Sequence, residues 1–200
     1  MGYDYRRMTQ EERVAVVDER RARGYPLHAP PHPYRGPGWY CIHAANFEHA
    51  NVMSSPERLT GFEDRLLEGL RDAGAEVGAW VVLTNHYHVL VSVASLDQVS
   101  GALRWLHGRT SRAWNLEDEL TGRRKVWYSF RDRAIRDERH TYHALNYLHF
   151  NAVKHGYVDS VYDWPWSSVH LYYDTYGREW LREHWVRYPI GTGWHYGDHG

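Results

Sequence analysis

The sequence predicts an α+β fold of the ferredoxin-like (RRM-like) type, in which helices pack on one face of an antiparallel sheet. Two observations indicate this class. Segments that alternate apolar and polar residues, as half-buried strands do, are interspersed with segments whose apolar residues recur at helical spacing. From residue 39 onward their order is strand, helix, strand, strand, helix, strand, helix, and no internal repeat interrupts it.

Local signals bound these strands and helices. Ser55 precedes a proline at a helix start, Gly74 can end that helix, and Asp97 and Asp137 each stand where a further helical pattern begins. The predicted elements, in order, are a strand from residue 39, a helix over 55–74, strands over 79–83 and 86–93, a helix over 97–114, a strand within 126–135 and a helix over 137–156.

The chain divides into three predicted parts. Residues 1–36 form a short N-terminal helix, capped at Thr9 with Glu12 three residues later, and a proline-rich arm. Residues 37–175 form the main domain. Residues 176–200 form an aromatic C-terminal tail, and we expect short helices or irregular structure from Tyr157 onward.

The composition excludes several classes of protein. About 42% of the 200 residues are apolar and 24% are charged, which is typical of a soluble globular protein and excludes low-complexity disorder. No apolar run reaches the roughly 18 residues of a membrane span, and the first residues predict no secretory signal. Cys41 is the only cysteine, so a disulfide scaffold is excluded and a reducing, cytoplasmic compartment is expected.

Two histidines lie in the strand predicted over 86–93. His86 and His88 are two residues apart, so both side chains project from one face, whereas Tyr87 projects from the other. Two imidazoles on one face form half of a site for a divalent metal ion. Because the chain contains 15 histidines, the spacing alone also fits two exposed histidines that bind nothing.

The helix predicted over 137–156 carries an apolar stripe and a second stripe that is polar or cationic. The second stripe consists of His140, His143, Tyr147, Asn151 and Lys154. A tyrosine hydroxyl is a weak nucleophile at neutral pH, but a metal ion on a phosphate, or a nearby cation, can compensate. Asn151 offers a carbonyl oxygen to such a metal site. The alternative is a solvated helix face with one half-buried tyrosine.

Two longer segments resemble a known family. AWVVLTNHYHVLV, at residues 79–91, resembles the strand pair that carries the HUH motif of single-tyrosine transposases. Residues 126–172 resemble the REP-associated tyrosine transposases, in which a Tyr-x-x-x-Asn helix is followed by Lys/Arg-x-Gly-Leu/Trp-Val and Trp-Pro-x-Ser-Ser segments. The HUH motif alone is loose, whereas its ordered combination with the tyrosine helix and DWPWSS is specific.

The resemblance implies an HUH endonuclease that cleaves and rejoins single-stranded DNA, often at hairpins. Tyr147 matches the nucleophile, His86 and His88 match the ligands of Mg²⁺ or Mn²⁺, and Asn151 matches the polar third ligand. The implied transesterification leaves a 5′-phosphotyrosine and a free 3′-hydroxyl, and it needs no nucleotide cofactor. The resemblance further implies a prokaryotic, nucleoid-associated protein without a membrane, and it leaves monomer and homodimer both open.

Two residues depart from the family pattern. Thr84 stands where the family commonly has proline before Asn85, and Ala152 replaces the usual proline after Asn151. Alanine restores a helical N–H, so we expect a straighter helix. Neither change removes a catalytic atom.

Basic residues between Gly101 and Arg139 outnumber acidic ones by ten to six, which favours contact with phosphates. The candidate DNA contacts are Arg104, Arg109, Arg112, Arg123, Arg124, Lys125, Arg131, Arg136, His143 and Lys154. Trp127, next to the GRRK loop, is the preferred residue for stacking on a base. The alternative for the arginines is a solvated face with ordinary salt bridges.

Two other functions fit the same residues. One is a single-stranded nucleic-acid-binding domain of the same fold without catalysis, which would not require Tyr147, His86, His88 and Asn151 together. The other is a metal-dependent phosphodiesterase that uses water, for which no covalent protein–DNA adduct is expected.

Overall fold

The computed structural model describes residues 36–120 and 124–190, together with six residues of the N-terminal segment: Thr9, Glu11, Glu12, Val14, Ala15 and Asp18. Residues 36–190 lie within one compact unit. The proline-rich arm before residue 36, the loop at 121–123 and the residues after 190 lie outside the described part. In the N-terminal segment, Thr9 and Glu12 exchange the two hydrogen bonds of the predicted capping box.

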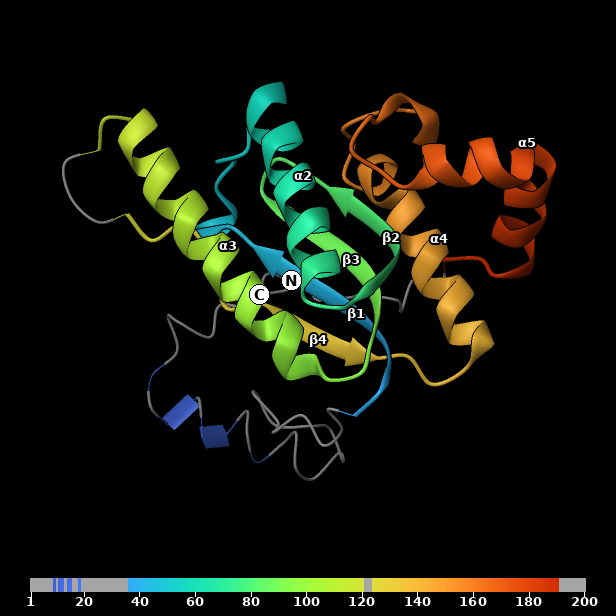
Figure 1. Cartoon of the computed structure of the whole chain (residues 1–200), viewed down its shortest axis with the longest axis horizontal. Helices are drawn as coiled ribbons and strands as arrows, with labels where there is room; N and C mark the ends of the chain where they lie inside the picture. Colours follow the sequence, from blue (N-terminus) through green and yellow to red (C-terminus); the bar gives the residue numbers. More distant parts are fainter. Residues whose placement is uncertain are drawn as a thin grey trace. The chain divides into compact units, whose positions relative to one another are not determined.

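One antiparallel sheet organises the described part of the chain (Figure 1). Its strands are β1 (Gly38–Ala45), β2 (Glu76–Val82), β3 (His86–Val93) and β4 (Arg131–Ala134), in the order β2-β3-β1-β4. The α-helices are α2 (Pro56–Asp72), α3 (Leu96–Glu117), α4 (Glu138–Lys154) and α5 (Val169–Arg187), with short 3-10 helices η1 (Phe47–His49) and η2 (Val161–Asp163). The predicted α+β fold with an antiparallel sheet is confirmed.

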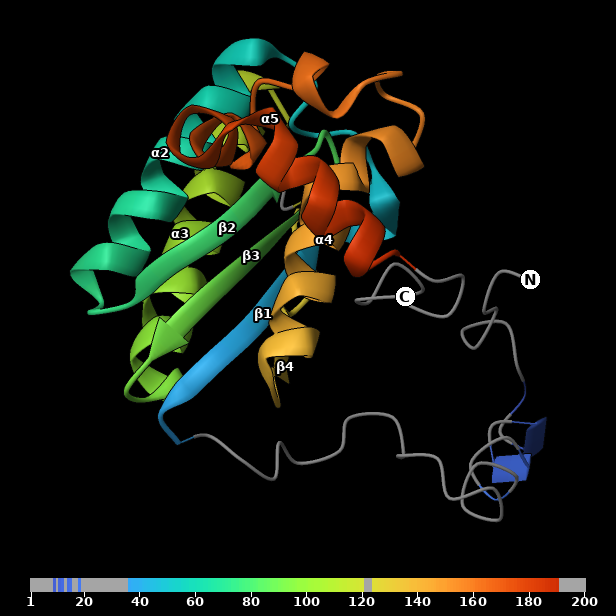
Figure 2. The same ribbon diagram turned by 90° about the vertical axis from the view of Figure 1, so that its right-hand side faces the viewer.

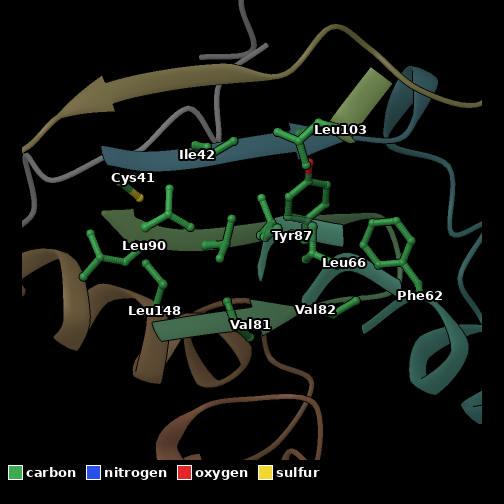
Figure 3. Packing of buried hydrophobic residues seen from close by; sticks show 14 of the residues in the cluster. Cys41, Ile42, Phe62, Leu66, Val81, Val82, Tyr87, Leu90, Leu103 and Leu148 are labelled. Atoms are coloured by element: carbon green, nitrogen blue, oxygen red, sulfur yellow. The ribbon is translucent and has the colours of Figure 1, made fainter. Parts of the chain in front are cut away.

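Helices cover both faces of the sheet. Helices α2 and α3 lie on one face, where Phe62 and Leu103 pack against Tyr87 (Figure 3). Helix α4 lies on the opposite face (Figure 2), where Leu148 packs near Leu90 and Val81. We expected all the helices on one face, and this expectation is wrong for α4, the helix predicted over 137–156. Its apolar stripe needs a partner, and the second face of the sheet provides one.

The helix starts are fixed by side-chain caps. Ser55 accepts a hydrogen bond from Arg58 N, and Asp137 accepts one from His140 N at 2.7 Å, as predicted. The cap of α3 is Ser95 and not Asp97, because the Ser95 hydroxyl accepts from the Asp97 amide. Asp97 instead lies in the first turn, where its charge complements the helix dipole.

The DWPWSS segment closes the outer edge of β2. The Val82 amide donates to the Trp166 carbonyl, and the Ser168 amide donates to the Trp80 carbonyl, each at 2.9 Å. The Trp164 indole also donates to the Val82 carbonyl, at 2.9 Å. These bonds satisfy backbone groups that an open sheet edge would expose.

Helix α5 is broken at Gly177, whose φ of 82° only glycine adopts readily. It therefore consists of two short helical stretches on either side of residue 177, in keeping with the short helices expected from Tyr157 onward. None of the described helices combines the length and the apolar character that a membrane span requires.

Candidate active site

Three histidines line the face of the sheet that α4 covers. His86 and His88 project from β3 toward α4, and the centroids of their rings lie 5.3 Å apart at 90°. The third is His43 of β1, which pairs with His88 across the strands and stacks on it at 4.5 Å. All three are less than a tenth exposed. The predicted common face of His86 and His88 is confirmed, and the reading of them as exposed histidines is wrong.

The tautomer of His86 is set by its neighbour Asn85. The Asn85 amide donates to the His49 carbonyl at 3.1 Å, which turns its side-chain oxygen toward His86. That oxygen lies 2.6 Å from His86 Nδ1, so Nδ1 carries the proton and Nε2 presents its lone pair. An imidazole oriented in this way is ready to ligate a metal ion through Nε2.

Asn151 of α4 faces that lone pair. Its side-chain oxygen lies 3.1 Å from His86 Nε2, so two electron-rich atoms confront one another unless a cation or a proton lies between them. Two adjacent ligands of an octahedral Mg²⁺ ion, each about 2.1 Å from the metal, are about 3 Å apart. The separation of the two atoms therefore fits a shared divalent cation. In the described part of the chain, Asn151 Nδ2 is buried without a hydrogen-bond partner.

The histidines do not form a metal site by themselves. Within residues 36–120 and 124–190, no three His, Cys, Asp or Glu side chains are grouped as a metal ion would require. A site for a divalent ion would therefore need the amide of Asn151 in addition to His86 and His88. Mg²⁺ and Mn²⁺ both accept mixed nitrogen and oxygen ligands, with different strengths.

Tyr147 lies at the centre of the same face. Its ring meets the ring of His88 edge-on, with 5.3 Å between centroids. Lys154, two turns later on α4, donates from Nζ to the Tyr147 hydroxyl at 3.1 Å and lies 4.7 Å from the ring centroid. Tyr147 itself is only 1% exposed. The helix spacing in the sequence thus correctly predicted that Tyr147, Asn151 and Lys154 share one face.

Thr84, the first departure from the family pattern, has a structural role. Its hydroxyl lies 2.7 Å from Asn51 Oδ1 and 2.7 Å from the Tyr157 hydroxyl. It thereby joins the turn before His86 to the segment that follows α4. A proline at this position has no hydroxyl and cannot make either bond. At the second departure, α4 continues through Ala152 to Lys154 without a break.

A basic rim extends from this face toward the sheet edge. Strand β4 is the edge strand next to β1, and its register pairs Arg131 with His43 and Arg133 with Cys41. Paired residues of antiparallel strands project from the same face, so both arginines share the face of His43. We call the exposed residues Arg131, Arg133, Arg136 and Arg139 the basic rim.

Arginines of the basic rim contribute to lowering the pKa of two histidines of α4. Burial lowers the pKa of His140, and the charges of Arg133 and Arg136 lower it further. Burial also lowers the pKa of His143, and the nearby Arg139 acts in the same direction. The start of α4 adds the positive end of its helix dipole to this region. The region suits an anion such as a phosphate.

The other predicted DNA contacts lie elsewhere. Arg104, Arg109 and Arg112 are exposed on α3, which packs on the opposite face of the sheet from Tyr147. Arg124 pairs with Asp118 at 2.7 Å, and Lys125 lies over the ring of Phe47 at 4.7 Å. Arg123 lies outside the described residues.

Trp127 does not fit its predicted role as a base-stacking residue. It is 7% exposed, stacks on the buried His107 at 4.5 Å, and donates from its indole to the Thr110 hydroxyl at 3.0 Å. Its large apolar surface is used in the core between the sheet and α3, and it cannot reach a base from there.

The residues of this face that the sequence did not predict are His43, Asn85, Arg133 and Arg139. His43 lies in a strand that was recognised, but its partner depends on the β1–β3 register, which no local pattern reveals. Asn85 adjoins the HUH histidines, but its sequence position alone does not show that its side chain turns toward His86. The alternation of Arg131 and Arg133 along a strand was a usable signal, because period two places both on one face.

Comparisons with known proteins give a consistent picture. No protein-family model matches the chain. The chain is 33% identical over 104 residues to the REP-associated tyrosine transposase of Escherichia coli K12, which covers 50% of this chain and 58% of that protein. A Haemophilus influenzae relative that bears the same family name is 31% identical over 105 residues, covering 48% and 59%. The chain therefore spans less than two thirds of the length of the curated relatives it matches.

A solved structure shares the fold. It is a REP-associated tyrosine transposase bound to a REP hairpin, with a TM-score of 0.59 and 24% identity, and the match covers 74% of this chain and 87% of that one. The curated relatives thus bear the family name that the sequence resemblance indicated, and the solved structure shares the fold.

Proposed function

We propose that this chain, a homologue of the REP-associated tyrosine transposases over about half of its length, cleaves and rejoins single-stranded DNA at hairpins. The observation that carries the proposal is the position of the Tyr147 hydroxyl. It is held by the Lys154 ammonium on a helix whose next turn brings Asn151 against His86. A nucleophile, a cation and a candidate metal site thus share one face of the sheet.

In the proposed reaction, the Tyr147 oxygen attacks the phosphorus of a DNA phosphodiester. The new O–P bond forms as the bond from phosphorus to the 3′ oxygen breaks, and that oxygen takes up a proton to become the free 3′-hydroxyl. The product is a 5′-phosphotyrosine, which a 3′-hydroxyl of another strand can attack in reverse. The Lys154 ammonium favours the charged phenolate over the neutral phenol.

A divalent cation, Mg²⁺ or Mn²⁺, would be held by His86, His88 and Asn151 and would offset the negative charge that builds up on the phosphate. The chain's own part is to fix these ligands. Asn85 sets the tautomer of His86, and α4 places Asn151 within 3.1 Å of its ring. In this proposal the nucleophile and the ligands all come from one chain.

The basic rim supports a polyanionic substrate beside Tyr147. Arg131 and Arg133 project from the same face as His43, and Arg136 and Arg139 flank the start of α4. Phosphate contacts of this kind position a strand without reading its sequence. The solved structure that shares the fold is bound to a REP hairpin, which makes a hairpin the first substrate to test.

The test uses a hairpin oligonucleotide with single-stranded flanks, taken from repeats near the gene and labelled at either end. We expect the wild type with Mn²⁺ to release a labelled 3′-hydroxyl fragment and to retain the other fragment on the protein in a denaturing gel. Tyr147→Phe should bind the hairpin within a few-fold of wild type and cut nothing.

The two alternative functions give different gels. Cut DNA without any protein-linked fragment would indicate a phosphodiesterase that uses water. Bound but uncut DNA, across several flanking repeats and both metals, would indicate a binding domain without catalysis. Either result would overturn the proposed transesterification.

A further inference from the structure

We infer that His43 is a positioning residue of this site, which holds the imidazole of His88 in its functional orientation. The inference rests on the proposed role of His88 as a metal ligand. Neither the family resemblance nor the chain's histidine spacing points to His43, which lies in β1, more than forty positions before His88. What brings the two residues together is the strand register.

The contact follows from the sheet geometry. His43 and His88 are direct partners in the β1–β3 pair, so their side chains emerge side by side from the same face. Their rings stack at 4.5 Å with an interplanar angle of 27°. His43 also meets His86 edge-on, with 5.8 Å between centroids. His43 is thus the aromatic neighbour that both predicted ligands share.

Four residues contact the His88 ring from different sides. His43 stacks on it from β1, Val81 is its partner on β2, and His86 and Tyr147 each meet it edge-on with 5.3 Å between centroids. Among these contacts only the stack with His43 lies along the face of the ring, so this stack opposes rotation of the ring plane. Truncating His43 would leave a space the size of an imidazole, into which His88 can turn.

The same geometry argues against His43 as a further metal ligand. Imidazole lone pairs lie in the plane of the ring, and the planes of two rings stacked at 4.5 Å and inclined by only 27° do not meet within the length of a metal–nitrogen bond. In the described part of the chain, the three histidines are accordingly not grouped as a metal site. His43 acts on the site through His88.

Three variants separate the roles. His43→Ala removes the stack, His43→Phe keeps a flat ring but no nitrogen, and His107→Ala is the matched control. His107 is also a buried histidine stacked at 4.5 Å on an aromatic ring, that of Trp127, but it lies on the opposite face of the sheet. Thermal unfolding of each variant gives the stability change that the other measurements are compared with.

Two measurements report on His88 without DNA cleavage. The first is the two-dimensional NMR spectrum of the imidazole nitrogens in the metal-free protein. The second is the Mn²⁺ dissociation constant from an EPR titration. We expect His43→Ala to shift or broaden the His88 signals and to weaken Mn²⁺ binding by roughly 10- to 100-fold, as loss of a supporting residue commonly does. His43→Phe should restore both to within about threefold of wild type, and His107→Ala should change neither.

Unchanged His88 signals in His43→Ala would overturn the inference, whatever the protein does to DNA. If His43→Phe proved as defective as His43→Ala, the imidazole nitrogen rather than the stacked ring would matter, and positioning by stacking would be wrong. A wild type that forms no DNA adduct contradicts the proposed function, but it leaves the NMR comparison as a separate decision on His43.

Discussion

The Lys154 ammonium donates a hydrogen bond to the Tyr147 hydroxyl at 3.1 Å, across two turns of α4. The same ammonium lies 4.7 Å from the centroid of the tyrosine ring. Lys154 therefore contacts both the oxygen and the π face of the proposed nucleophile. A cation held there stabilises the phenolate that attack on a phosphate requires.

Replacing Lys154 by methionine should slow adduct formation at saturating DNA by roughly 10- to 100-fold. A hydrogen bond to a charged group contributes about 1.5–3 kcal/mol, and the variant loses it in the phenolate state. Single-turnover rates at saturating DNA measure the loss.

The other lysine of the chain supplies the control for that experiment. Lys125 also lies over an aromatic ring, that of Phe47, at 4.7 Å. Lys125→Met should leave the single-turnover rate unchanged at saturating DNA. Equal losses in the two variants would mean that the charge near Tyr147 has no special role.

Asn85→Ala should weaken divalent-metal binding by about 10- to 100-fold, because His86 then loses the acceptor that fixes its tautomer. Asn85→Asp keeps an oxygen at the same position and should bind metal nearly as well as the wild type. Calorimetric titration with Mn²⁺ compares them. Asn115→Ala, which removes a bond to Arg124 on the other side of the sheet, should behave as wild type. Wild-type affinity in Asn85→Ala would contradict the tautomer argument.

Stability should fall as the pH drops from about 6.5 toward 4. Burial lowers the pKa of His107 to about 4 and that of His149 to about 3, whereas both take up protons near 6.5 in the unfolded chain. Between these values the unfolded state binds more protons, so acid favours unfolding, and each residue costs about 2 kcal/mol at pH 5. Thermal unfolding at pH 7 and at pH 5 measures the loss.

A variant of His149 isolates its share. Neither ring nitrogen of His149 has a hydrogen-bond partner in the described part of the chain, so leucine at this position should be tolerated at pH 7. His149→Leu should lose less stability than the wild type on going to pH 5. Exposed His49→Gln is the control and should follow the wild type. An identical pH dependence in all three proteins would show that His149 does not carry the effect.

The double substitution Arg131→Ala with Arg133→Ala should weaken hairpin binding and lower the magnitude of its salt dependence by about one unit of slope. The matched control is Arg104→Ala with Arg109→Ala, which removes two exposed arginines from α3 on the opposite face. Binding isotherms at several salt concentrations compare the two pairs. A larger loss of hairpin affinity in the α3 double variant would mean that DNA binds on the face of the sheet opposite Tyr147, and would contradict the proposed site.

Residue spacing predicted much of this structure, because within one strand or helix the spacing shows which side chains share a face. The strand spacing of His86 and His88, and the helix spacing of Tyr147 and Asn151, correctly gave the face of each residue. Which faces meet depends on long-range pairing, so His43 was not found, whereas Arg133 alternates with Arg131 along the strand and could have been predicted locally. Trp127 was misplaced for a related reason, since its position beside a basic loop suggested exposure while its packing against His107 depends on α3.

The most direct test of the account is the chemical identity of the protein–DNA link. After reaction with a hairpin substrate and Mn²⁺, the protein is digested with nuclease and protease, and the peptide that contains Tyr147 is sequenced by tandem mass spectrometry. We predict a nucleotide attached through its 5′ phosphate to the Tyr147 oxygen, and no such peptide from Tyr147→Phe. A link at any other residue, or the same cleavage in Tyr147→Phe, would contradict the assignment of Tyr147 as the nucleophile.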